Sequence, residues 1–136
     1  MIWPLYLGIV LFQILLTYPR FSTTCLDDEG VGLAVYIAHH FLDVFVFWSF
    51  LFLTTRTEHL VHLLVISGVV LHWLTNNYEC VATTYMNAKC GFDRRQWLDS
   101  IVNRVKPFYY THIVWLLALA GYDVWYYMHC FQLLCE

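Results

Sequence analysis

The chain has 136 residues, of which 60% are hydrophobic and only 12% are charged. Soluble domains are roughly 45–50% apolar and about 25% charged, so this composition excludes an ordinary soluble domain and is typical of a small membrane protein. The formal net charge is −3, and the few basic residues are clustered, which argues against a general nucleic-acid binder. The five cysteines form no CxxC pair and no zinc-finger spacing, so no thioredoxin-like motif is indicated.

Four apolar runs predict an all-α bundle of four transmembrane helices in a single membrane domain. The runs cover about residues 2–18, 31–53, 59–74 and 108–127, close to the roughly 17–25 residues that a spanning helix needs. The first run favours a helix over a signal peptide because no basic segment precedes it. Thr55 and Glu58 have the spacing of a capping box, and the short link at 54–58 predicts an antiparallel hairpin.

Residues 75–107 form the sizeable extramembrane segment of this prediction. Asp93 can cap an amphipathic helix that extends to Val105, with an apolar stripe at four-residue intervals and a polar opposite face. Such a helix lies in the membrane interface or docks on the end of a bundle. We expect this loop to bind a partner protein through Arg94, Arg95, Trp97, Ile101 and Arg104.

The basic residues predict the orientation of the bundle. Four crossings place the 19–30 and 75–107 loops on one side, and the termini and the 54–58 turn on the other. Of the seven basic residues, Arg56 alone falls on the terminal side. Since basic loops face the cytosol, both loops are predicted to be cytosolic.

A polar cluster is predicted inside the bundle. Asp43 follows His39 by four positions and His40 by three, so either imidazole can share its helix face. His72 and His112 are predicted to lie in the same half of the membrane. An ionisable group at a helix centre costs about 2.5–3.5 kcal/mol, so such groups face other helices. Three interpretations are open: hydrogen bonding between helices, a haem or metal site, and a proton or ion path.

Other polar residues of the apolar runs receive simpler interpretations. His59 and His62 share a helix face near the opposite membrane surface and are predicted to be interfacial. Asp123 interrupts the fourth run, ahead of the aromatic stretch 125–127. His129 lies beyond that stretch, and we expect no special role for it.

Two readings are open for the cysteines of the large loop. A Cys80–Cys90 bridge would close a small loop. A cytosolic loop is normally kept reduced, however, so free thiols are the alternative.

The segment at residues 72–83, HWLTNNYECVAT, resembles a segment of small uncharacterised multi-pass membrane proteins of large double-stranded DNA viruses. It is distantly similar to an uncharacterised bacterial membrane family as well. The resemblance extends over about residues 59–122 and carries no catalytic residue. It implies an internal viral membrane derived from host endoplasmic reticulum, on whose cytosolic face a capsid assembles. It also implies thiol oxidation in the cytosol, which would permit the Cys80–Cys90 bridge.

Composition and resemblance together predict a non-enzymatic structural component of a viral inner membrane or of the host endoplasmic reticulum. Its partners are the lipid bilayer and capsid or other membrane proteins, which the 75–107 loop would contact. No cofactor and no nucleic acid is expected. One alternative is a membrane redox or haem protein that uses the intramembrane histidines. A further alternative is a small viroporin-like proton or ion channel that uses the same cluster.

Overall fold

The structure is a computed structural model that describes residues 3–18, 30–77, 79–90 and 111–129. Within these ranges every regular element is helical, which confirms the predicted all-α class. The elements are α1 (Trp3–Thr17), α3 (Val31–Trp48), the short 3₁₀ helix η2 (Ser49–Leu51), α4 (Arg56–Thr75), α5 (Val81–Cys90) and α7 (Thr111–His129).

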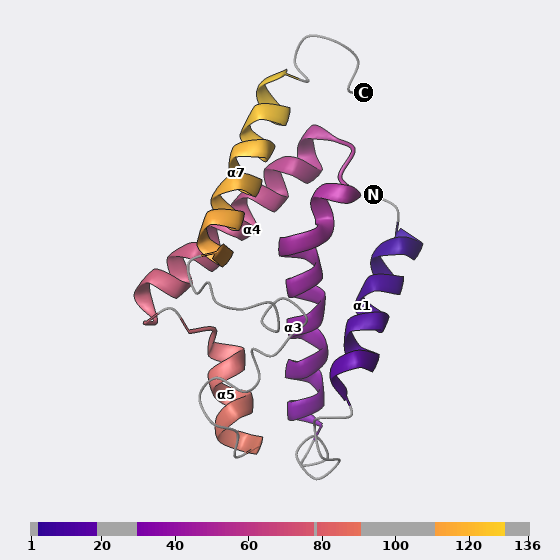
Figure 1. The fold of residues 1–136 in the computed structure, drawn as a ribbon, viewed down its shortest axis with the longest axis vertical. Coiled ribbons are helices and arrows are strands. Elements are labelled where there is room, and N and C mark those ends of the chain that lie inside the picture. The colour runs from indigo at the N-terminus through magenta and orange to yellow at the C-terminus, as the bar shows by residue number, and fades with distance from the viewer. Residues whose placement is uncertain (1–2, 19–29, 78, 91–110, 130–136) are drawn as a thin grey trace.

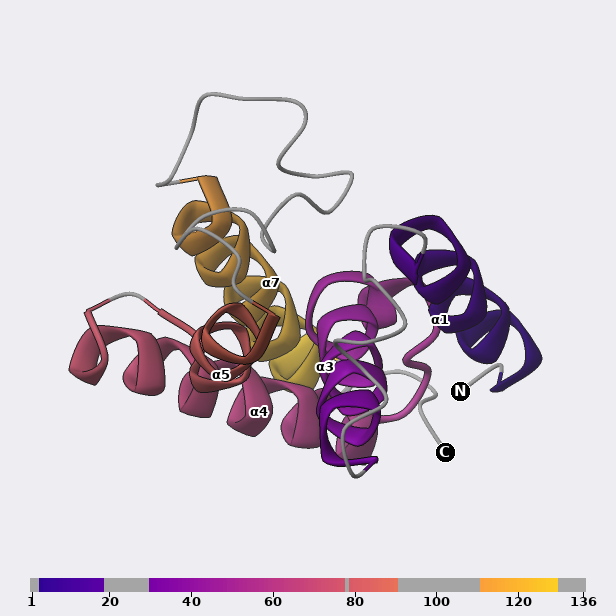
Figure 2. The same cartoon turned by 90° about the horizontal axis from the view of Figure 1, so that it is seen from below.

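Helix α3 lies at the centre of the arrangement (Figures 1 and 2). Helix α1 packs along one side of it, and the pair formed by α4 and α7 lies on the other side. Successive long helices reverse direction, so that α1 and α4 run downward in Figure 1 while α3 and α7 run upward. The start of α1, the end of α7 and the turn between α3 and α4 therefore lie toward the same end of the bundle.

The turn between α3 and α4 forms the predicted capping box. The Thr55 hydroxyl accepts the Glu58 backbone N–H, and the Glu58 carboxylate accepts the backbone N–H of Thr55. Each side chain thereby satisfies a backbone donor that the helix itself leaves without a partner. Helix α4 begins at Arg56, three residues before the predicted apolar run. The apolar run did not include these three residues because they are polar.

Helix α5 is a feature that the sequence interpretation missed, since residues 75–107 were predicted as an extramembrane loop with a helix only at 93–105. The buried Met86 of α5 packs against the buried Tyr36 of α3, with Ile14 of α1 beside them. The first part of the loop thus belongs to the bundle. The predicted amphipathic helix at 93–105 lies outside the described residues.

The predicted bridge between Cys80 and Cys90 is not formed. Cys80 is a free cysteine, whereas Cys90 is disulfide-bonded. Of the two cysteines, Cys80 therefore follows the free-thiol alternative.

Two helical segments are long and apolar enough to cross a membrane, namely residues 31–51 of α3 with η2, and α4. Only 28% and 17% of the residues in their apolar windows are buried, so most of their apolar surface faces outward. Helix α1 is a shorter apolar helix. By length and composition, the described residues thus support two candidate spans, where the sequence predicted four.

Candidate functional site

The seam between α4 and α7 is built from one stripe of buried residues on each helix. Residues spaced at i, i+3 and i+7 lie on one face of an α-helix. Because α4 and α7 run antiparallel, the polar ends of both stripes meet near the 54–58 turn, and the apolar ends meet further along. The stripes are His59, His62 and Ile66 of α4, and Leu116, Leu119 and Asp123 of α7.

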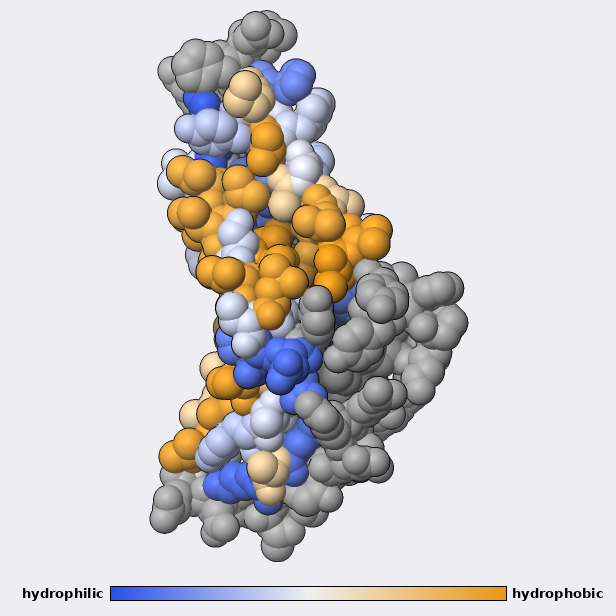
Figure 3. Space-filling view, turned by 90° about the vertical axis from the view of Figure 1, so that its left-hand side faces the viewer, coloured by the Kyte–Doolittle hydropathy of each residue, from blue (hydrophilic) through white to orange (hydrophobic). Residues whose placement is uncertain are grey.

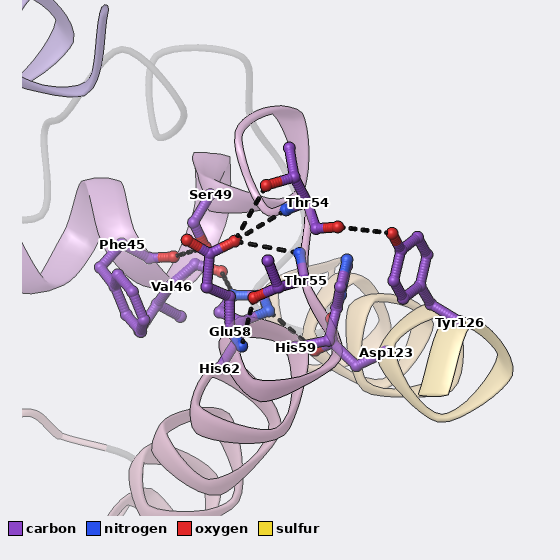
Figure 4. A network of polar contacts seen from close by, with 10 residues as sticks. All are labelled: Phe45, Val46, Ser49, Thr54, Thr55, Glu58, His59, His62, Asp123 and Tyr126. Atoms are coloured by element: carbon purple, nitrogen blue, oxygen red, sulfur yellow. Dashed lines mark hydrogen bonds and ion pairs between the residues drawn. The ribbon is translucent and has the colours of Figure 1, made fainter. Parts of the chain in front are cut away.

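Asp123 joins two histidines of the facing helix (Figure 4). Its Oδ1 lies 2.7 Å from Nδ1 of His59, and its Oδ2 lies 2.7 Å from Nδ1 of His62. The side chains of all three residues are fully buried. We call this group the His–Asp–His cluster. Such short contacts in a dry interior mark strong, charge-assisted hydrogen bonds.

The second nitrogens of the two imidazoles have different surroundings. Nε2 of His62 lies 3.2 Å from the backbone carbonyl oxygen of Val46, which links the cluster to α3. Nε2 of His59 is buried and has no hydrogen-bond partner among the described residues. The cluster therefore connects three helices. One of its ring nitrogens, Nε2 of His59, makes no hydrogen bond within the described residues.

Aromatic rings enclose the cluster. The His59 ring stacks on Tyr126 with centroids 3.9 Å apart, and Tyr122 meets it edge-on at 5.6 Å. Phe45 of α3 meets the His62 ring edge-on at 5.5 Å. Of these rings, Tyr126 alone presents its face to an imidazole, and the negative face of an aromatic ring favours a nearby positive charge.

Toward the 54–58 turn the cluster is close to polar groups. The Tyr126 hydroxyl donates to the Thr54 carbonyl oxygen at 2.8 Å, which ties α7 to the turn (Figure 4). Glu58 Oε2 accepts the backbone N–H groups of Thr54 and Thr55 at 2.8 and 3.1 Å. Both threonines are exposed.

Away from the turn the cluster is sealed by apolar side chains. The next buried residue on α4 after His62 is Ile66, which forms one core cluster with Val46, Leu116 and Leu119. Val65, Val69, Val70 and Trp73 of α4 pack around this core, together with Phe47, Phe50 and Ala120. Among the described residues, the next polar ring along this core is His112, which meets Phe47 edge-on at 5.9 Å.

The residues of the predicted polar cluster lie elsewhere, and the first of them joins α3 to α1. His40 is buried, with Nε2 3.1 Å from the Thr17 hydroxyl and Nδ1 3.4 Å from Oε1 of Gln13. The Tyr36 hydroxyl shares a 2.5 Å hydrogen bond with Thr17 and donates to the Ile14 carbonyl oxygen. These hydrogen bonds hold α1 against α3.

The other members of that prediction make separate contacts. His39 lies beside His40 with its ring 6.3 Å away, and Asp43 hydrogen-bonds to Gln13. His72 Nε2 accepts the backbone N–H of Val81 and so caps the start of α5. His112 meets Phe47 edge-on. Asp43, His72 and His112 thus each contact a neighbouring element, at three separate places in the bundle.

No family model matches this chain, and neither a curated protein nor a solved structure matches it significantly. In the described ranges no three His, Cys, Asp or Glu side chains are arranged to hold a metal ion. The predicted partner-binding residues Arg94, Arg95, Trp97, Ile101 and Arg104 lie outside the described residues.

The His–Asp–His cluster was missed from the sequence, although a signal for it is present. His59 and His62 were predicted to be interfacial, yet both are fully buried. Asp123 was treated as an interruption, yet it lies inside α7. Two histidines on one face of an apolar helix need a partner, and a carboxylate in another apolar helix needs one too. These two requirements together indicate contact between Asp123 and the histidines at 59 and 62.

Proposed function

We propose that this chain is an integral membrane protein of structural type, which anchors an assembly to a lipid bilayer. One observation carries the proposal: the bundle leaves large apolar side chains exposed while it buries ionisable side chains. Leu15, Leu64, Leu71 and Leu117 are each about 60% exposed, at 62%, 64%, 62% and 60%. His59, His62 and Asp123 are at most 1% exposed.

This distribution suits a lipid environment because an apolar outer surface gains nothing from facing water. Monomeric soluble proteins rarely expose contiguous apolar patches above a few hundred Å². On the face viewed in Figure 3, a broad band of hydrophobic side chains crosses the described surface, with hydrophilic side chains above and below it. In a bilayer, polar side chains turn inward to satisfy one another, as they do here.

The proposal includes four crossings. Helices α1 and α7 would cross beside the two candidate spans, since the four long helices alternate in direction along the chain. Helix α7 carries Asp123, which lowers its mean hydropathy, but that carboxylate faces α4 and is fully buried. A charge that pairs inside the bundle is compatible with a spanning helix.

The anchoring role is proposed for the segment at 75–107. Its start packs on the bundle through α5, and its arginines at 94, 95 and 104 could form bidentate contacts with acidic groups of a neighbouring protein. The resemblance of residues 72–83 suggests a viral inner membrane as the setting, with a capsid or membrane protein as the partner.

Anchoring is favoured over the two alternatives by what the histidines already contact. A haem protein that uses the predicted cluster would need imidazoles with a free nitrogen on a shared face. Here both nitrogens of His40 have polar neighbours and His72 caps α5. A channel would need a continuous polar path, whereas the buried residues next to the His–Asp–His cluster in the α4–α7 seam are Ile66, Leu116 and Leu119.

Extraction and charge reversal test the proposal in sequence. The protein should stay with membranes during alkaline carbonate washing and be released only by detergent. Replacing Arg94 and Arg95 by Glu should then abolish its incorporation into the native assembly, while membrane insertion is unchanged. Replacing them by Lys is the matched control and should retain most incorporation. Release by carbonate would refute membrane anchoring, and normal incorporation of the Glu variant would refute the role of this segment.

A further inference from the structure

We propose that the His–Asp–His cluster is a proton-binding site, which takes up one proton from the aqueous end of the bundle at Nε2 of His59. The inference follows from a count of donors and acceptors in the buried cluster, and it is independent of the anchoring role. The ligand is the proton itself, delivered by water at the 54–58 turn.

His62 fixes the first part of the count. Its Nε2 faces the Val46 carbonyl oxygen, which can only accept, so Nε2 carries a hydrogen. Its Nδ1 faces a carboxylate oxygen of Asp123 at 2.7 Å, and one proton must lie between those two atoms. Whether that proton resides on nitrogen or on oxygen, the pair holds two protons and has no net charge.

His59 fixes the second part. Its Nδ1 faces the other Asp123 oxygen at 2.7 Å and donates to it. A neutral imidazole carries one ring hydrogen, so Nε2 of His59 is then a bare lone pair. This agrees with the absence of a partner for that buried atom among the described residues. The resting cluster thus contains three protons, with overall neutrality in a dry interior.

A fourth proton on His59 would give the cluster one net positive charge, and two neighbouring groups offset part of the cost of burying that charge. The Asp123 carboxylate lies against both imidazoles, and the Tyr126 ring stacks on His59 at 3.9 Å. A carboxylate and an aromatic face both stabilise imidazolium. When this proton dissociates from Nε2, the hydrogen bond between Nδ1 of His59 and Asp123 is unchanged.

The other titratable groups around the cluster are already engaged or point elsewhere. On α4, Glu58 caps the helix, and the Arg56 guanidinium lies over the Tyr127 ring at 4.4 Å. On α7, the rings of Tyr122 and Tyr126 cover His59, and His129 lies exposed against the Trp125 carbonyl oxygen. On α3, Asp43 is hydrogen-bonded to Gln13 of α1.

The cluster lies between the polar 54–58 turn on one side and apolar side chains of the α4–α7 seam on the other. His59 lies in the first turn of α4, next to the exposed residues of the 54–58 turn. In the other direction, Ile66, Leu116 and Leu119 offer no proton acceptor among their side chains. A proton that reaches the cluster from the turn therefore meets no further acceptor among these three side chains.

Ring-nitrogen NMR of the full chain tests the site. Protein with ¹⁵N-labelled histidine is placed in phosphatidylcholine nanodiscs, and signals are assigned with single His→Gln variants. At neutral pH, His59 should show a protonated Nδ1 and a bare Nε2, and His62 a protonated Nε2. On acidification, Nε2 of His59 should become protonated. ¹⁵N-labelled imidazole added to the buffer reports when the acidic condition suffices to protonate an imidazole in water.

Two results of this experiment would overturn the proposal. One is a His59 whose Nε2 already carries the hydrogen at neutral pH. The other is a His59 whose Nε2 stays bare when the added imidazole is protonated. The Asp123→Asn variant adds an independent check, since loss of the carboxylate should leave His59 neutral under the acidic condition. Uptake equal to wild type in that variant would also refute the role given to Asp123.

Discussion

Asp123 is the residue on which the α4–α7 seam depends most. Its two oxygens engage two imidazoles, both at 2.7 Å and both fully buried. Polar contacts between transmembrane helices contribute about 0.6 kcal/mol on average. Leaving a buried donor without a partner costs roughly 1–3 kcal/mol, so loss of this carboxylate costs more than loss of an average contact.

Two substitutions of Asp123 should therefore distinguish the contribution of its hydrogen bonds to stability from the contribution of its charge. Asp123→Leu should lower the free energy of unfolding by roughly 1–3 kcal/mol, because two imidazoles lose their acceptor. Asp123→Asn should cost less, since the amide keeps one acceptor oxygen and offers an N–H donor. The measurement is reversible unfolding in detergent micelles. Ser67→Ala on the exposed face of α4 is the control and should change little. Equal stability of the Leu and Asn variants would contradict the proposed geometry.

At the level of single residues, the sequence indicated that buried polar groups pair between helices, but it did not indicate the pairing of Asp123 with His59 and His62. The rule that buried ionisable groups pair between helices is correct for Asp123 and for His40. His39, His40 and Asp43 drew attention because they are close in sequence, whereas His59 and Asp123 are 64 positions apart. Sequence proximity reveals shared helix faces, but it does not reveal which helices pack together.

At the scale of elements, the start of α4 was predictable because its signal is local. Thr55 and Glu58 satisfy each other's backbone donors across a single turn, and this arrangement depends on four consecutive residues. Helix α5 gave no comparable signal. Its sequence is only weakly apolar, and it is held by contact of Met86 with Tyr36, a partner 50 positions away along the chain.

The capping box should make a measurable contribution to stability. Thr55→Ala removes the hydroxyl that accepts the Glu58 backbone N–H at 3.3 Å, and we expect a loss of about 0.5–2 kcal/mol. Thr57→Ala, in the same exposed first turn, is the matched control and should be close to neutral. Unfolding in micelles compares the two variants. If both had the same effect, the cap would have no energetic role.

At the scale of the whole molecule, two indicators of orientation disagree. Basic residues favour a cytosolic position for the 75–107 segment, since six of the seven fall on the loop side. The disulfide at Cys90 favours an oxidising compartment. Thiol oxidation in the cytosol would reconcile them. Cys80 lies at the start of α5 as a free thiol and can report on the side directly.

Labelling of Cys80 with a membrane-impermeant thiol reagent should occur from the cytosolic side of sealed vesicles. We expect this result because positive charge dominates the orientation of small membrane proteins. Cys80→Ser is the control that identifies the labelled site. Labelling from the lumenal side alone would reverse the orientation and would agree with an ordinary disulfide at Cys90.

The all-α class and the two candidate spans follow from composition and hydropathy, because these quantities need no knowledge of packing. The number of crossings cannot be predicted from hydropathy alone. Asp123 lowers the mean hydropathy of α7, and only the packing of α7 on α4 shows that this carboxylate is paired inside the bundle. The direct question is therefore whether the exposed apolar faces of α4 and α7 lie in lipid.

Photo-crosslinking at Leu64 and Leu117 answers that question most directly. Each leucine is replaced in turn by a benzophenone amino acid in membranes, and the products are analysed by mass spectrometry. Leu64 is 64% exposed and Leu117 is 60% exposed, and both should form adducts with lipid acyl chains. The same substitution at the exposed Thr57, in the turn, should form few. Acyl adducts at both leucines would establish that α4 and α7 face the bilayer, whereas their absence at both positions would contradict the membrane bundle.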